Sequence, residues 1–478
     1  MSDLGARPTR DEASEIISYV ARAAEDFLGA LNDAPVAPEG FEQAAAALGG
    51  RLPEYGDGAP AALRALVEDG LGGAVRSSGP RFFHFVTGGV TPAALGADWI
   101  ASVIDQNPGA WIASPLAAQL EVVALSWLRD LFGLPQTWAG VLTTGATMAN
   151  FTALACARRW WGQRHGVDVD ERGVALLPQM PVLSSGYAHP SALKALAMLG
   201  VGRSNVQTFA RDAAGRLDLD SMRRSLESLG STPAVIIANA GEVNAGDFDP
   251  IAAMADLAAA HSAWLHVDGA FGLFAGVSPR SAHLVHGVDR ANSVIADGHK
   301  WLNVPYDCGY AFVADADLLR GPFALSAAYL ESLQDPNPNF GILGPESSRR
   351  ARSLAVWATL RAYGRDGYRA LVERHLDLAQ HLAARVDEAS NLERLADVQL
   401  NIVCFRWRPP GVAEERLDEL NRRLADAVLA DGRVFVGSTV YEGKVALRPA
   451  IVNWMTEERD VDLLVDVVRE LGSLLDGA

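Results

Sequence analysis

One lysine most constrains what this chain can fold into. Residues 293–297 form a short apolar run typical of a buried strand, and a tight turn at Gly298 leads to Lys300, which stands between a histidine and a tryptophan. An ammonium in such a place is costly unless it is paired or used chemically. A desolvated lysine becomes an amine nucleophile that can form a Schiff base with a carbonyl. The pattern therefore predicts a reactive lysine at the end of a central strand.

Composition limits the classes of protein to which such a lysine can belong. The chain has 478 residues, of which 49% are hydrophobic, so it can bury a large core. Its formal net charge is -17, which argues against a surface that binds polyanions. We therefore expect no nucleic acid partner.

The termini and the cysteines indicate a compartment. Residues 1–5 lack a basic region followed by an apolar core, which predicts no signal peptide, and no apolar run reaches transmembrane length. Cys156, Cys308 and Cys404 are scattered and show no paired spacing. This predicts neither a disulfide framework nor a zinc site, and favours a reducing, cytoplasmic setting without membrane attachment.

The chain divides into three predicted parts. Residues 1–79 read as an N-terminal helical arm, since 11–32 carry apolar positions at helical spacing and Pro- and Gly-rich linkers follow. Its apolar surface needs a cover, for which a partner subunit is a candidate. Residues 80–366 alternate strands and helices, and 367–478 combine helices at 371–389 and 413–430 with short strands at 400–406, 434–439 and 444–449.

Polar residues follow several strands of the central part. Repeated strand–loop–helix units predict a mainly parallel sheet with ligands at the carboxyl ends of its strands. Five candidates fall at such ends: Thr144–Thr147, His189, Asn244, Asp268 and Lys300. Each also has an ordinary structural interpretation. The Gly145 turn could be a simple helix start, His189 a structural loop residue, Asp268 the cap of a turn, and Lys300 the partner of Asp297.

Pyridoxal phosphate needs what this set contains. The cofactor requires a lysine, an acidic partner for its pyridine nitrogen and an anion site for its phosphate. Lys300, Asp268 and the turn Gly145–Thr147 can supply these, and a flat histidine at position 189 could lie over the ring. Small residues at a helix start favour an anion, because backbone N–H groups and the helix dipole both point there.

At these residues the chain resembles the pyridoxal-phosphate group II decarboxylases, which include the aromatic-amino-acid and glutamate decarboxylases. The resemblance covers nearly the whole chain. The motifs that carry it are Arg81-Phe82-Phe83, Ser114-Pro115, Gly145-Ala146-Thr147 with Asn150, His189, Val267-Asp268-Gly269-Ala270, Phe248-Asp249-Pro250, Asp297-Gly298-His299-Lys300-Trp301 and Arg349-Arg350-Ala351-Arg352-Ser353.

The resemblance implies an architecture and a set of roles. The expected fold is α/β of fold type I, with a large doubly wound, mainly parallel seven-stranded sheet, a small C-terminal α+β domain and an N-terminal helical arm. It also implies a homodimer with sites at the subunit interface. Lys300 would carry the cofactor, Asp268 would pair with the pyridinium, His189 would stack on the ring, and Ala146, Thr147 and His299 would bind the phosphate.

Two departures from the family pattern bear on the chemistry. Where many relatives have threonine, this chain has Glu242-Val243-Asn244. The resemblance therefore implies a cofactor contact from Asn244 less strongly than it implies the other contacts. An ungapped count back from Arg349 places Phe340 at the position of the family's catalytic loop tyrosine, and Tyr329 lies nearby. In aldehyde synthases of the family, phenylalanine at that position accompanies oxidative deamination.

The expected reaction is decarboxylation of an L-amino acid to its amine. Phe85, Thr87, Trp111 and Phe340 are candidate substrate contacts, and the aromatic rings of Phe85 and Trp111 would accept a bulky or aromatic side chain. Tyr329 and His299 are candidate proton donors. The alternatives are aldehyde synthesis or transamination with the same cofactor, and a non-catalytic binding protein on an old enzyme scaffold, against which the intact Lys300, Asp268 and His189 argue.

Overall fold

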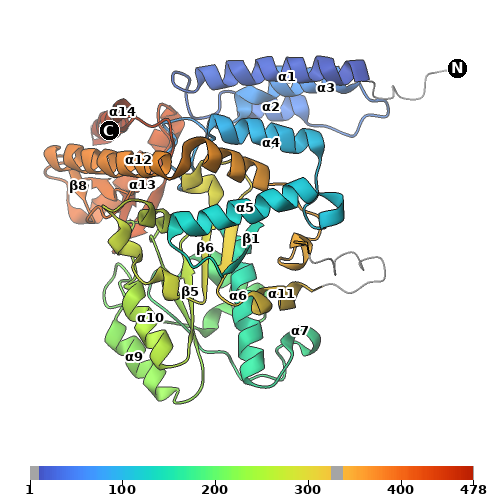
Figure 1. The fold of residues 1–478 in the computed structure, drawn as a ribbon. Coiled ribbons are helices and arrows are strands. Elements are labelled where there is room, and N and C mark those ends of the chain that lie inside the picture. The colour runs from blue at the N-terminus through green and yellow to red at the C-terminus, as the bar shows by residue number, and fades with distance from the viewer. Residues whose placement is uncertain (1–9, 325–336, 477–478) are drawn as a thin grey trace.

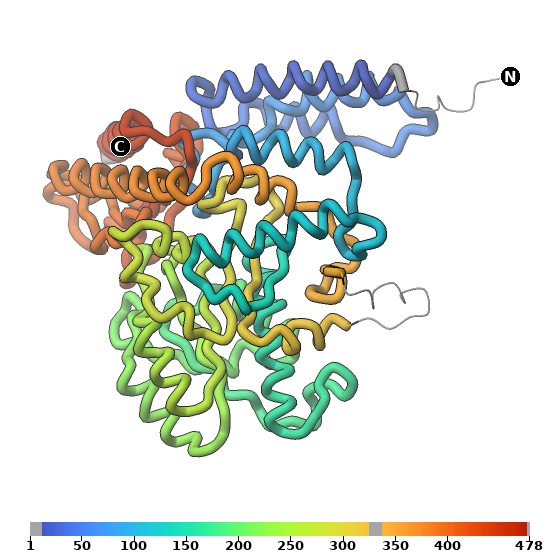
Figure 2. Tube along the Cα trace, in the orientation of Figure 1, coloured from blue at the N-terminus to red at the C-terminus, as the bar shows by residue number. Residues whose placement is uncertain are grey.

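The computed structural model describes residues 10–324 and 337–476. A large sheet forms the centre, the N-terminal helices lie at the top of the view above helix α4 (Pro92–Ile104), and the C-terminal elements form a smaller unit to one side (Figures 1 and 2).

The central sheet has seven strands in the order β1-β7-β6-β5-β4-β2-β3. The pairs β3–β2, β2–β4, β4–β5 and β5–β6 are parallel, whereas β7 runs antiparallel to both of its neighbours. The predicted mainly parallel seven-stranded sheet is confirmed. Its strands are β1 (Ala139–Thr143), β2 (Val182–Ser184), β3 (Val206–Thr208), β4 (Val235–Asn239), β5 (Trp264–Asp268), β6 (Ser293–Asp297) and β7 (Gly309–Val313).

Helices cover both faces of this sheet, as a doubly wound fold requires. Successive residues of β4 point to opposite faces: Val235 and Ile237 pack with α6 and α8, whereas Ile236 and Ala238 pack with α5, α10 and α12. Strands buried on both faces explain the continuous apolar runs in the sequence. The helices of this part are α4, α5 (Pro115–Phe132), α6 (Ala146–Arg164), α7 (Val169–Arg172), α8 (Pro190–Met198), α9 (Leu219–Ser228), α10 (Ile251–Ala260) and α11 (Ala316–Arg320).

The N-terminal arm is helical, as expected. It contains α1 (Arg10–Ala30), α2 (Phe41–Leu48) and α3 (Ala59–Ala65). The linker after α1 is fastened to the C-terminal unit, because the Val36 N–H donates to the Gly432 carbonyl at 2.7 Å. Across residues 10–324 and 337–476, no helix combines the length and apolar character needed to cross a bilayer.

The C-terminal unit has its own antiparallel sheet in the order β10-β11-β9-β8. The predicted strand at 400–406 is wrong for most of its length: only its last two residues belong to a strand, because residues 401–403 pair irregularly with 449–451. The predicted domain boundary between residues 366 and 367 falls within the long helix α12. The division into domains stays a prediction. The elements are α12 (Ser353–Glu388), α13 (Glu414–Asp431), α14 (Glu458–Asp476), β8 (Leu392–Arg394), β9 (Phe405–Trp407), β10 (Ser438–Tyr441) and β11 (Lys444–Leu447).

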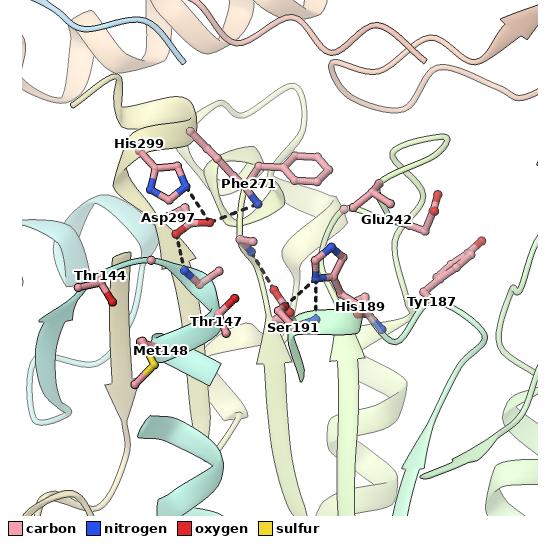
Figure 3. Close-up of a pocket in the computed structure, with 18 residues that line it drawn as sticks. Thr144, Thr147, Met148, Tyr187, His189, Ser191, Glu242, Phe271, Asp297 and His299 are labelled. Atoms are coloured by element: carbon pink, nitrogen blue, oxygen red, sulfur yellow. Dashed lines mark hydrogen bonds and ion pairs between the residues drawn. The ribbon is translucent and has the colours of Figure 1, made fainter. Parts of the chain in front are cut away.

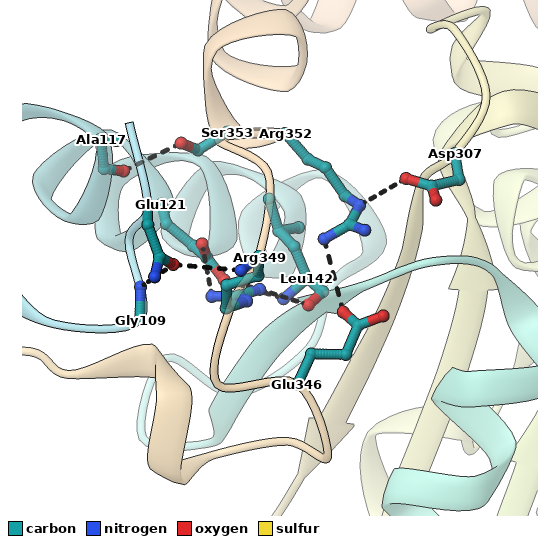
Figure 4. Close-up of polar contacts among 10 residues, drawn as sticks. Gly109, Ala117, Glu121, Leu142, Asp307, Glu346, Arg349, Arg352 and Ser353 are labelled. Carbon is teal, nitrogen blue, oxygen red and sulfur yellow. Dashed lines mark hydrogen bonds and ion pairs between the residues drawn. The ribbon is translucent and has the colours of Figure 1, made fainter. Parts of the chain in front are cut away.

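A buried ion pair fastens the edge strand β1 to the segment before α12 (Figure 4). The guanidinium of Arg349 donates to both carboxylate oxygens of Glu121 at 2.9 Å, and both side chains are almost fully buried. Glu121 also accepts the Leu142 N–H at 3.0 Å, and Arg349 donates to the Leu142 carbonyl. The pair therefore supplies hydrogen bonds to an edge strand that has a neighbour on one side only.

We expect Glu121→Gln to destabilise the protein by about 3–5 kcal/mol, since it leaves the Arg349 charge buried without a counterion. Urea unfolding followed by circular dichroism measures this. The matched control is Asp130→Asn, which breaks an exposed pair with Arg365 and should cost less than about 1 kcal/mol. Equal costs for the two variants would contradict the assignment.

Candidate active site

The carboxyl ends of the central strands enclose a cavity of about 290 Å³ (Figure 3). It lies where β1, β5 and β6 end and where α6 and α8 begin. Its wall contains the lysine, the carboxylate and the histidine that the sequence places at strand ends. The lining residues are Thr144, Gly145, Ala146, Thr147, Met148, Tyr187, His189, Ser191, Asn239, Gly241, Glu242, Val243, Asp268, Ala270, Phe271, Asp297, His299 and Lys300.

Lys300 lies in the turn Gly298–Leu302, directly after β6. Its Nζ is 3.3 Å from Asp297 Oδ2 and 5.8 Å from the centre of the Phe271 ring. The lysine side chain keeps 14% of its surface exposed, so its amine faces the cavity while its charge is paired. The ordinary interpretation, a pair with Asp297, is thus present in the structure and does not remove Lys300 from the cavity.

The turn that carries Lys300 is held from below by its neighbour Trp301. The Trp301 indole N–H donates to His375 Nδ1 at 2.8 Å, and His375 Nε2 donates to the Asn453 carbonyl at 3.0 Å. Trp301, His375 and Asn453 are buried in the core, and burial lowers the pKa of His375 to about 3. The lysine turn is therefore fixed to α12 and to the C-terminal unit through a neutral histidine.

Helix α6 opens toward the cavity with the predicted turn. Gly145 has φ +135°, a conformation that favours glycine, and an added Cβ would come within 3.2 Å of the His299 ring. The Ala146 N–H donates to Asp297 Oδ1 at 2.5 Å. The next N–H groups, of Thr147 and Met148, are among those that lack an intrahelical acceptor at a helix start.

His299 stands beside this helix start. Its ring stacks on Tyr306 with 4.2 Å between centroids, and its Nε2 is 3.5 Å from Asp297 Oδ2. Its Nδ1 is buried and has no hydrogen-bond partner within the described chain. Burial lowers the pKa of His299, so the ring is neutral at neutral pH. In the neutral Nδ1–H tautomer this unused nitrogen can donate to a ligand oxygen.

Asp268 and His189 face the cavity from β5 and from the start of α8. Asp268 Oδ2 accepts from Asn150 at 2.9 Å, and its Oδ1 accepts the Ala270 N–H at 3.2 Å, so the carboxylate also caps a turn. His189 Nδ1 lies 2.6 Å from Ser191 Oγ, and burial lowers the pKa of His189. The structure therefore brings Lys300, Asp268, His189, His299 and the Gly145 turn into one cavity.

Asn244 is not brought into this cavity. Its backbone N–H donates to Glu242 Oε1 at 2.8 Å, and its side-chain amide is shared between Glu242 and Thr439 of β10. Both ends of the amide are thus used within the loop and by the small sheet. Glu242, two residues earlier, lines the wall instead.

The predicted substrate contacts lie outside the cavity of this single chain. The Phe85 ring is 63% exposed and stacks on His84, and Thr87 Oγ1 bonds the Tyr306 hydroxyl at 3.0 Å. The Trp111 N–H donates to Asn339 at 2.7 Å. Phe340 is buried in the core with the Arg349 guanidinium 5.5 Å above its ring, so it does not face the cavity. Tyr329 lies outside the described residues.

Several lining residues are not among those predicted from the sequence. Asp297 follows β6 directly, so the rule that locates Asp268 could have located it as a site residue. Phe271 and Tyr187 read as ordinary core aromatics, and nothing in a single sequence distinguishes a ring that lines a cavity from one that fills the core. Glu242 stands out in the sequence only as a departure from a family pattern.

The donor set fits pyridoxal phosphate. An amine with a paired charge, a carboxylate in the cavity wall and a helix start beside an unpartnered His299 nitrogen match the aldehyde, the ring nitrogen and the phosphate of that cofactor. The missing side chain at Gly145 keeps the helix start open toward His299.

Comparison with known proteins agrees with this geometry. Residues 64–408 match the family model described as the pyridoxal-dependent decarboxylase conserved domain. The chain is 30% identical to an aromatic-L-amino-acid decarboxylase of Bacillus atrophaeus over 80% of this chain and 79% of that protein. It is 32% identical to an L-2,4-diaminobutyrate decarboxylase of Rhizobium meliloti over 88% and 83% respectively.

A solved structure shares the fold along its whole length. The crystal structure of Oryza sativa TDC with PLP and tryptamine superposes with a TM-score of 0.89 at 25% sequence identity, and covers 99% of this chain and 100% of that one. Fold type I is thereby confirmed for this chain.

The neutral histidine beneath the lysine turn predicts a pH dependence. His375 binds a proton in the unfolded chain below about pH 6.5 but resists it in the folded state until about pH 3, so stability should fall as the pH drops through that window. We expect urea midpoints to decline between about pH 7 and about pH 5, and to decline less steeply in His375→Gln, by up to about 1.4 kcal/mol per pH unit. Parallel curves for the two proteins would contradict this.

Proposed function

Because the chain belongs to the pyridoxal-dependent decarboxylase family, we propose that it releases carbon dioxide from an L-amino acid whose side chain is bulky or aromatic. The cofactor is pyridoxal 5'-phosphate and the enzyme class is a carboxy-lyase. The observation that carries the proposal for this chain is the convergence of Lys300, Asp268 and His189 on one cavity at the strand ends.

In this proposal each wall of the cavity holds one part of the cofactor. The start of α6, with Gly145, Ala146 and Thr147, and the unpartnered Nδ1 of His299 hold the phosphate. Asp268 pairs with the ring nitrogen, while Lys300 provides the amine that binds the aldehyde.

When bound, the cofactor supplies an electron-accepting ring that stabilises negative charge at the substrate α-carbon. The protein residues supply position and protons. The Asp268 carboxylate favours a protonated ring nitrogen, since an opposite charge nearby stabilises the cationic form. The neutral His189 ring covers one side of the cavity and keeps water from it, and Lys300 can hold or give a proton at Nζ while Asp297 balances its charge.

The aromatic substrate class is supported by the rings of Phe271 and Tyr187 in the wall. The relatives named for aromatic substrates or products point the same way. A second candidate is an amino acid with a cationic side chain, which the buried Glu242 carboxylate in the wall would attract. The relationship to a diaminobutyrate decarboxylase favours it too.

Lys300→Ala should abolish carbon dioxide release and the visible absorbance of the bound cofactor. The chain has three lysines, Lys194, Lys300 and Lys444, and of these only Lys300 lines the cavity. Borohydride reduction of the loaded protein, followed by digestion and mass spectrometry, should therefore place the cofactor on the Lys300 peptide. Lys194→Ala, on the exposed side of α8, is the matched control and should retain activity. Modification of Lys194 or Lys444 instead would overturn the assignment.

A panel of L-amino acids tests the substrate and the product together. If the rings of Phe271 and Tyr187 determine substrate preference, aromatic amino acids should be decarboxylated faster than 2,4-diaminobutyrate. The reverse order of rates would favour the second candidate, in which Glu242 attracts a cationic side chain. Glu242→Gln is the discriminating variant, because it removes the charge while keeping the shape. Ammonia, hydrogen peroxide and keto-acid are measured beside the amine, and their formation in place of amine would replace the decarboxylase proposal with the aldehyde or transaminase alternative.

We also propose that the protein acts as a homodimer. Helix α4 and the turn after it expose apolar side chains, among them Ile100, Val103 and Ile112, of which Val103 and Ile112 are about three-quarters exposed. Monomers rarely leave so many neighbouring apolar residues in water. The helical arm lies above α4 in the view of Figure 1, so a second copy could cover both.

Light scattering after size exclusion should give twice the mass of one chain. Val103→Asp with Ile112→Asp should shift the protein toward the single-chain mass, because charges oppose burial at an interface. The exposed substitution Leu474→Asp on α14 is the control and should keep the wild-type mass. A wild-type protein with the mass of one chain would refute the dimer.

A cytoplasmic location is the remaining part of the proposal. All three cysteines are buried and unpaired, which suits a reducing compartment.

A further inference from the structure

A chain of hydrogen bonds runs behind the cavity wall through residues that do not themselves line it. It begins at Trp264 and passes through Ser293 and His266 to Asn150. Asn150, His266 and Ser293 have no exposed surface, and Trp264 has about 1%. No solvent can reorient such a chain, so the donor in each bond is decided by the groups at its ends.

The end at Trp264 fixes the first bond, and the ionised Asp268 at the other end fixes the rest. An indole N–H can only donate, so Trp264 Nε1 gives its hydrogen to Ser293 Oγ at 3.0 Å. The Ser293 hydroxyl then donates to His266 Nδ1 at 2.9 Å. The neutral ring carries its proton on Nε2, which donates to Asn150 Oδ1 at 2.8 Å. Burial lowers the pKa of His266 to about 4, in agreement with a neutral ring.

The other end is the Asp268 carboxylate, which can only accept when ionised. Asn150 Nδ2 donates one hydrogen to Asp268 Oδ2 at 2.9 Å. A flipped amide would place its oxygen against the Asp268 carboxylate oxygen. The Asp268 end thus fixes the orientation of the Asn150 amide, and the Asn150 oxygen in turn requires the proton on His266 Nε2.

The chain divides at Asn150, since the amide has a second hydrogen. This hydrogen goes to Ser191 Oγ at 3.1 Å, and the Ser191 hydroxyl donates to His189 Nδ1 at 2.6 Å. The Ser191 backbone N–H, which can only donate, also points at that nitrogen at 3.2 Å. His189 Nδ1 therefore bears no proton, and the ring proton is on Nε2.

We propose that Asn150 is a positioning residue that sets the two catalytic groups of this site at once: it holds Asp268 as an ionised acceptor and His189 as the Nε2–H tautomer. The proposal rests on the proposed function, since it concerns groups assigned to the cofactor. Trp264, Ser293 and His266 supply the donor that the Asn150 oxygen accepts, and the two amide hydrogens of Asn150 reach β5 and the start of α8.

Asn150→Asp is the decisive variant, because it keeps the shape and still accepts from His266 but can donate neither to Asp268 nor to Ser191. We expect the dissociation constant for pyridoxal phosphate to rise at least tenfold and the absorbance bands of the bound cofactor to change their ratio. The control is Thr152→Val, two residues along α6, where the buried Oγ1 has no hydrogen-bond partner in the described chain. It should bind cofactor as the wild type does. Binding and spectra within twofold of wild type in Asn150→Asp would overturn the proposal.

Two further measurements keep the result decisive if Asn150→Asp does not fold. Ser293→Ala removes the donor to His266 without touching the cavity, and should weaken cofactor binding at least threefold; unchanged binding counts against the proposal. Nitrogen NMR of the full chain labelled with ¹⁵N-histidine, with and without cofactor and assigned with His189→Gln and His266→Gln, should show both rings protonated on Nε2. An Nδ1–H tautomer at either residue would refute the inference. Failure of the wild type to bind pyridoxal phosphate would instead refute the proposed function, because the tautomers are also read in the cofactor-free protein.

Discussion

The site depends above all on the Asp297 carboxylate. It lies at the end of β6, accepts the first N–H of α6 and stands within 3.5 Å of both Lys300 and His299. One buried anion therefore links a strand end, a helix start and the lysine turn. A buried charge is tolerated only when it is paired and hydrogen-bonded, and here the paired groups are the same ones that hold the cofactor in our proposal. The same Asp297 contacts therefore determine both the geometry of the cofactor site and the stability of this corner of the sheet.

The part of the site that could be predicted from the sequence follows from the geometry of parallel sheets. Strands buried on both faces read as apolar runs, and their carboxyl ends meet at one edge, so the order of residues alone predicts that Asp268, Lys300 and the Gly145 turn lie together. The same rule could not place Asn244, because the direction of a side chain within a loop depends on neighbours such as Thr439 that are distant in the sequence.

Substrate contacts are less predictable for a related reason. Phe85 and Trp111 are candidates because of their aromatic character, and Phe340 because of its position in a count along the loop. An aromatic ring is equally suited to a core, a surface or a ligand wall. Phe340 packs inside the core beneath Arg349, whereas the Phe85 ring remains exposed. Counting along a loop without gaps cannot tell these cases apart. Polar groups inside strands are hidden for another reason: His266 occupies one position of a buried five-residue strand, where the pattern shows only that the strand is central.

The histidines explain how two carboxylates and one lysine can share so small a space. Burial lowers the pKa values of His189, His266 and His299, so at neutral pH none of them adds a positive charge beside Lys300. Charged histidines would compete with the lysine for Asp297 and Asp268, and would repel a protonated ring nitrogen. A neutral histidine ring instead affects its neighbours through which of its two ring nitrogens carries the proton. Because the position of this proton is set by fixed partners, the Ser191 N–H at His189 and the Asn150 oxygen at His266, these two rings keep one arrangement before any ligand enters.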